Sequence, residues 1–117
     1  MQLLVYISNQ ADHMPRVLSG LMNAGVKGAT VVKCEGMLSA LASNPEFELP
    51  AFFSRSRAKF NIEGESGKML LAVMPDELIL TAENVIRDIC GDFRKPDTGV
   101  MFSLPVMRFA GVSKDQQ

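Results

Sequence analysis

The stretch "KMLLAVMPDELILTAENVIRDICG", residues 68–91, decides the fold of this chain. Its first seven residues form an apolar run that predicts a β-strand, which Pro75 stops. Asp76 then has the properties of a helix cap, and apolar residues recur at helical spacing until about Cys90, where Gly91 closes the helix. This predicted apolar face consists of Leu78, Ile79, Ala82, Val85, Ile86 and Ile89. A strand is therefore followed directly by an amphipathic helix.

The N-terminal part of the chain repeats this arrangement. Residues 2–8, "QLLVYIS", form a short β-rich run and predict a buried strand. A helix is expected next, with Asp12 as its N-cap, Pro15 in its first turn and Gly25 at its end. Its predicted apolar face is Val17, Leu18, Leu21 and Met22. Residues 28–35, "GATVVKCE", predict the second strand.

A fourth strand is predicted at 100–106, "VMFSLPV", so the element order is β-α-β-β-α-β. Two helices with one apolar face each can cover one face of a four-stranded antiparallel sheet. The expected fold is therefore an α+β, ferredoxin-like plait in a single domain over residues 1–117.

The other face of this sheet is predicted to be apolar as well. Residues 3–7, "LLVYI", are all hydrophobic, although successive side chains of a strand point to opposite faces. An antiparallel sheet with one wet face should alternate instead. A chain of this length has nothing left with which to bury the second face, so we expect self-association.

About 30 residues separate the second and third strands where a short hairpin would suffice, and a connection of that length is functional or disordered. Residues 37–45 can form a short helical turn, and the tail at 113–117 is expected to be frayed. The loop at 37–66 also holds aromatic and basic residues: Phe52, Phe53, Arg55, Arg57 and Lys59. They fit a recognition arm for a partner protein, or a solvated strand whose aromatic residues pack on the next subunit.

Composition excludes several classes of function. The net charge of −1 argues against a nucleic-acid-binding protein. Cys34 and Cys90 fit the reducing cytoplasm, and we expect neither a signal peptide nor a transmembrane helix. His13 is the only histidine and has no ligand cluster around it, so no metal site is expected. No pair of carboxylates suited to acid–base catalysis is evident, and we expect a protein that is not an enzyme.

Two segments, "AGVKGATVVKCEGM" at 24–37 and "GDFRKPDTGVMFSLPV" at 91–106, resemble the PII-like signal-transduction family. The first resembles the family's path from helix one through strand two, and the second resembles its last loop and strand. "LPAFFS" at 49–54 is similar to an element of divergent members. Their order and spacing extend the resemblance from Gln2 to Val112.

The resemblance implies a homotrimer whose sheets pack around a central axis. It implies that a small effector, possibly an adenine nucleotide, binds in clefts between subunits. It also implies that the loop at 37–66 contacts a target protein, such as a transporter, an enzyme or a regulator. The positions that match the family's ligand-binding residues are Thr30, Gly36 and Gly99, with Lys114 as a substitute for an arginine.

The chain also departs from the family pattern. Leu38 replaces the second glycine of the loop, Val100 replaces a lysine, and the two arginines after the last strand are unmatched. Because phosphates require several convergent positive donors, the sequence predicts weakened binding of a triphosphate. Two alternatives stay open: a trimeric metal-binding or metal-tolerance protein similar to the CutA family, and a structural interaction module without a ligand.

Overall fold

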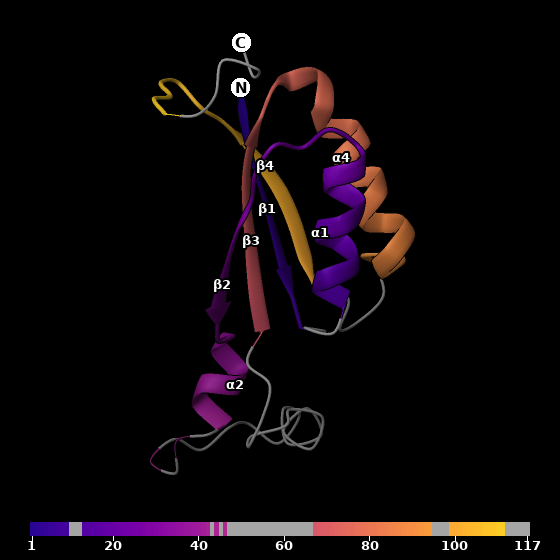
Figure 1. Cartoon of the computed structure of the whole chain (residues 1–117). Coiled ribbons are helices and arrows are strands. Elements are labelled where there is room, and N and C mark those ends of the chain that lie inside the picture. Colours follow the sequence, from indigo (N-terminus) through magenta and orange to yellow (C-terminus); the bar gives the residue numbers. More distant parts are fainter. Residues whose placement is uncertain (10–12, 43, 45, 47–66, 95–98, 112–117) are drawn as a thin grey trace.

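The computed structural model describes residues 1–9, 13–42, 44, 46, 67–94 and 99–111. In this part of the chain the elements follow the order β1 (Gln2–Ser8), α1 (Met14–Asn23), β2 (Thr30–Cys34), α2 (Met37–Ala42), β3 (Gly67–Met74), α4 (Asp76–Cys90) and β4 (Val100–Pro105). Figure 1 shows α1 and α4 on one side of the sheet, with α2 beyond one end of it.

The four strands form one antiparallel sheet in the order β2-β3-β1-β4. At the centre of the sheet, Leu4 of β1 lies opposite Ala72 of β3 and Ser103 of β4. β2 is shorter than its neighbour, pairing from Thr30 opposite Leu71 to Cys34 opposite Gly67. The prediction of an α+β fold with a four-stranded antiparallel sheet is confirmed.

The hydrophobic core lies between the sheet and the two long helices. It joins β1 and β3 to both helices through twelve buried residues: Leu4, Tyr6, Met14, Val17, Leu21, Val26, Leu70, Ala72, Met74, Ile79, Ala82 and Ile86. The predicted face of α4 is confirmed, because Ile79, Ala82 and Ile86 are buried while Leu78, Val85 and Ile89 pack at the edge of the core.

The start and the face of α1 differ from the prediction. His13 is the N-cap residue and makes no side-chain cap hydrogen bond, while the predicted cap, Asp12, lies outside the described residues. Met22 was expected on the apolar face, but its side chain is 68% exposed. Met14 is buried instead, because the apolar stripe that meets the sheet runs through Met14, Val17 and Leu21 and so begins one turn before Val17. Gly25 has a positive φ of 105°, as expected of the residue that ends the helix.

The start of α4 also corrects the sequence analysis. Pro75 is its N-cap in an extended conformation, and Asp76 is the first helical residue rather than the cap. A carboxylate in the first turn still interacts favourably with the helix dipole. Gly91 ends the helix at a φ of 90°, as predicted.

Strand ends shift by one or two residues from their expected places. The second strand covers Thr30–Cys34 instead of 28–35, and the fourth ends at Pro105 instead of 106. The predicted helical turn at 37–45 is present as α2. The rest of the long loop lies outside the described residues, apart from residues 44 and 46.

Candidate functional site

The candidate site is the face of the sheet that α1 and α4 leave uncovered. Along β1, Leu4, Tyr6 and Ser8 point towards the helices and are completely buried. The intervening side chains, Leu3 and Ile7 among them, must therefore point to the opposite side. That side is called the open face here.

The strand register extends the open face across all four strands. Residues directly opposite each other in an antiparallel sheet share a face. The open face therefore consists of Leu3, Val5, Ile7, Val32, Met69, Leu71, Val73, Val100, Phe102 and Leu104, with Thr30 and Cys34 completing β2. The first ten of these residues are all apolar.

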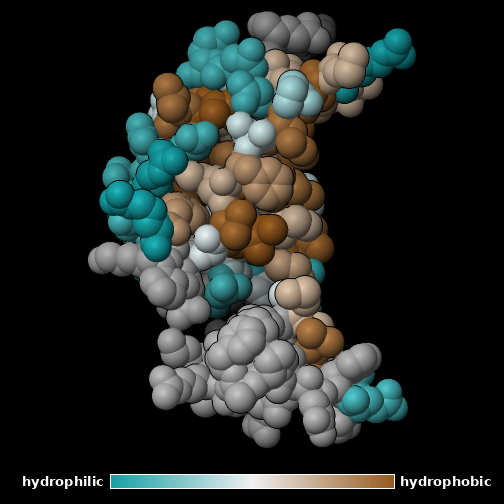
Figure 2. All heavy atoms as spheres, turned by 180° about the vertical axis from the view of Figure 1, so that it is seen from behind, coloured by the Kyte–Doolittle hydropathy of each residue, from teal (hydrophilic) through white to brown (hydrophobic). Residues whose placement is uncertain are grey.

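Exposure on this face is greatest along β4. Val100 is 54% exposed, Phe102 42% and Leu104 47%. Val32 on the opposite outer strand is 40% exposed. Figure 2 shows hydrophobic residues gathered over the sheet side, with hydrophilic residues gathered over the helix side. The sequence analysis predicted an apolar second face, and this prediction is confirmed.

Two glycines fix the backbone where β1 ends. A Cβ atom at Gly67 would lie 2.7 Å from the carbonyl oxygen of Ser8. Gly99 has a positive φ of 106°, and a Cβ atom there would collide with the carbonyl oxygen of Ile7. Only glycine permits so close an approach in such a conformation. Gly99 therefore has a structural reason to be glycine that is independent of any ligand.

The residues predicted to bind an effector do not meet within one chain. Thr30 is exposed at the start of β2, and Gly36 is exposed two residues after that strand. Gly99 precedes β4, on the opposite side of the sheet, with β3 and β1 in between. Three strand spacings separate these outer strands by about 14 Å. Lys114 lies outside the described residues.

The residues predicted for partner contact, Phe52, Phe53, Arg55, Arg57 and Lys59, also lie outside the described residues.

A polar pair that the sequence analysis missed lies at the edge of the core. The Tyr6 hydroxyl and the Cys90 thiol share a hydrogen bond of 2.9 Å, and the Tyr6 ring meets Phe93 edge-on with centroids 5.8 Å apart. Burial, and then the bond to Cys90, raise the pKa of Tyr6 from 10.0 to about 12. No local sequence pattern shows that a strand and a helix end 84 residues apart will meet, so this pair was not predictable from the sequence.

Some charged groups of the described residues form ion pairs at the surface. The amino group of Met1 lies 3.0 Å from Asp76, and this hydrogen bond lowers the pKa of that carboxyl. Arg94 pairs with Asp92 at 3.1 Å, and Arg87 with Glu83 at 3.6 Å. Within the described ranges, no three histidine, cysteine or acidic side chains come together in a way that could hold a metal ion.

A second feature missed from the sequence is the segment that follows β4. Met107 is 96% exposed and Phe109 is 42% exposed. The signal for this segment in the sequence is weak, because it consists only of apolar residues on both sides of Arg108.

The fold and the open face together define an α+β protein with an antiparallel sheet that its own helices cover on one side only. Comparison with models of known protein families gives no match, and no curated protein is significantly similar in sequence. Among the described residues, no helix has the length and hydrophobicity needed to cross a membrane.

Proposed function

We propose that this chain is a non-enzymatic regulatory protein of the PII-like type. In this proposal it is a ferredoxin-like plait that forms a homotrimer in the cytoplasm. The trimer binds a small effector between subunits and contacts a target protein through residues 37–66. The observation that carries the proposal is the open face, ten apolar side chains on a sheet that no helix of the described chain covers on that side.

The size of the open face supports self-association. Four strands about 4.8 Å apart and about six residues long cover a plan area of roughly 400 Å². The largest apolar patch on a typical monomer covers about 300–600 Å² and is often functional, so an area of this size is that of a contact surface.

The positions of the effector residues suit a site between chains. Thr30 and Gly36 belong to the β2 side of the sheet, and Gly99 belongs to the β4 side. A ring of copies arranged about one axis would place β4 of each chain near β2 of its neighbour. The proposed cleft is therefore completed only in the assembly.

The connection between β2 and β3 supports the partner contact. These strands are neighbours in the sheet, yet residues 35–66 lie between them. Two adjacent antiparallel strands need only a short turn, so such a long insertion is characteristic of a functional loop.

The assembly is tested by measuring mass in solution. Sedimentation velocity should give three times 12.8 kDa, or about 38 kDa. Substituting Phe102→Ser on the open face should shift the equilibrium towards single chains. Leu80→Ser is the matched control, because Leu80 is 70% exposed on α4. A wild-type mass of 12.8 kDa that does not change on concentration would refute the proposal.

The effector is tested by thermal shift against adenine nucleotides, cyclic nucleotides, bicarbonate and divalent metals. A ligand that binds only the native state stabilises it by RT ln(1 + [L]/Kd), so it raises the melting temperature. Thr30→Val should abolish that rise, and Thr81→Val on the exposed surface of α4 should not. A shift with metals alone would favour the CutA-like alternative instead.

A further inference from the structure

The segment at residues 106–111, called the C-terminal arm here, leaves the sheet on the side of the open face. Figure 1 shows the yellow end of the described chain turning away from α1 and α4. The backbone N–H of Val106 donates to the carbonyl oxygen of Met1 at 3.0 Å, which anchors the start of the arm beside β1. Beyond this bond the arm projects from the sheet and then bends (Figure 1).

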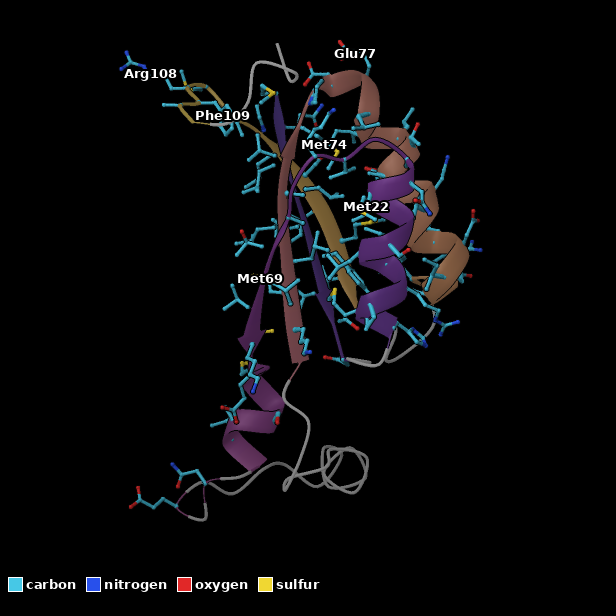
Figure 3. The ribbon with its side chains drawn as sticks, viewed as in Figure 1. Met22, Met69, Met74, Glu77, Arg108 and Phe109 are labelled. Carbon is cyan, nitrogen blue, oxygen red and sulfur yellow. The ribbon has the colours of Figure 1, made fainter. Side chains whose placement is uncertain are left out.

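The arm carries two large apolar side chains that are exposed, Met107 almost completely and Phe109 in part. Met107 is 96% exposed and Phe109 is 42% exposed. In Figure 3, Arg108 points away from the body of the protein, and Phe109 lies nearer to the sheet. Single exposed apolar side chains are normal on a protein surface, but these two follow directly after the exposed residues of β4 on the open face, and contiguous apolar patches mark interaction sites.

We propose that the arm is exchanged between copies of this chain, so that Met107 and Phe109 pack on the open face of a neighbouring copy. This inference rests on the proposed assembly and specifies how its subunits are held together.

The reach of the arm fits a second copy. Six extended residues span roughly 20 Å. A four-stranded sheet is about 19 Å wide. The arm begins level with the end of the sheet, because Pro105 lies opposite Gln2, which in turn lies opposite Met74. If the rotation axis of the assembly runs parallel to the strands, neighbouring copies lie at the same height along it. The arm would then meet Leu3, Val73 and Leu104 of the neighbour.

The chemistry of the open face also favours a second copy of this chain as its binding partner. The open face has no charged side chain, so a charged partner would lose solvation there without gaining an ion pair. The sheet face alone offers roughly 400 Å², whereas stable interfaces bury about 800 Å² per partner. In an exchanged arrangement each subunit contributes one arm and binds the arm of another subunit. This adds apolar contact to every subunit and brings the buried area closer to that of a stable interface.

The test joins two positions by a disulfide between different chains. Both native cysteines are replaced by serine, and a Phe109→Cys chain is mixed with a differently tagged Val73→Cys chain. Under oxidation we expect a covalent heterodimer on a denaturing gel. Arg108→Cys mixed with Val73→Cys is the matched control and should cross-link much less, because Arg108 points away from the sheet.

Dissociation provides a second measurement. The double substitution Met107→Ser and Phe109→Ser should weaken the assembly by about 100-fold in dissociation constant, whereas Arg108→Ser should change it little. If wild-type protein is a single 12.8 kDa chain, both the assembly and the arm exchange are refuted. If it is an oligomer that shows no 109–73 cross-link and dissociates alike in both arm variants, only the arm exchange is refuted.

Discussion

Replacing Gly20 with alanine is expected to destabilise the protein, although alanine is the better helix former. Gly20 lies in α1 where that helix meets α4. A Cβ atom there would be 2.7 Å from Cγ1 of Val85 and 3.5 Å from Cδ1 of Ile89. The first distance is well inside the ordinary van der Waals separation of about 3.5–4.0 Å. The two helices would have to separate, or the valine would have to leave its rotamer.

The expected magnitude follows from two opposing contributions. Alanine in place of glycine stabilises a helix interior by about 1 kcal/mol. Overpacking in a tight contact costs about 1–3 kcal/mol. The net loss in the free energy of unfolding should therefore be about 1 kcal/mol. In a Val85→Ala background the overlapping methyl group is absent, so the same change at Gly20 should stabilise the protein by up to about 1 kcal/mol.

Urea unfolding followed by circular dichroism measures both changes. Protein concentration must be held fixed, because association contributes to apparent stability. Ser19→Ala, at an exposed position of the same helix, controls for helix propensity. If Gly20→Ala stabilised the wild-type background as much as the Val85→Ala background, the close contact would not limit this site, and the reasoning would be wrong.

Three further predictions concern titration and the backbone. Tyr6 is the only tyrosine, so absorbance at 295 nm reports it alone: its native midpoint should be about 12 and that of the urea-unfolded chain near 10, and equal midpoints would contradict the burial and the Cys90 bond. The pKa of Asp76 is lowered in the folded protein, so its stabilising contribution is present above the ordinary value of 3.8 and lost as pH falls through the folded value. The difference in melting temperature between wild type and Asp76→Asn should therefore shrink from pH 5 to pH 2, and a constant difference would oppose this. Gly99→Ala should destabilise by about 2 kcal/mol, seen as a lower melting temperature, whereas Gly28→Ala, with no atom within 4 Å of the added Cβ, should be nearly neutral.

The helices and strands were largely predictable because their hydrophobic patterns are local. The face of α4 follows the 3.6-residue period without interruption, and the structure buries the expected positions. The open face was predictable for a similar reason, since an unbroken apolar run such as residues 3–7 must place side chains on both sides of a sheet.

The predictions that were wrong concern details that depend on competition between adjacent residues for one position, or on tertiary packing. Pro75 and Asp76 are both acceptable near a helix start, and Pro75, with φ −61° and ψ 152°, takes the cap position. Met22 matches the helical period from Leu18, but it lies beside the buried stripe of Met14, Val17 and Leu21. Sequence periodicity predicts that a helix has an apolar face more reliably than it predicts which residues lie at the edges of that face.

The candidate site was predictable only in part. The apolar character of the open face follows from strand composition. The separation of Thr30 and Gly36 from Gly99 follows instead from the strand order, which puts β2 and β4 at opposite edges. The exposure of Met107 and Phe109 depends on where the chain leaves the sheet, and no local pattern determines that.

The continuous apolar run of β1 has a consequence for folding. A one-residue slip of a strand normally exchanges its hydrophobic and polar faces, and this penalty keeps the alignment correct. Residues 3–7 are hydrophobic at every position, so such a shift would incur little penalty in this strand. The alignment must be enforced at its end, where Gly67 and Gly99 admit the carbonyl groups of Ser8 and Ile7 at distances that no other residue tolerates. We therefore expect these two glycines to favour the correct alignment of the central strand.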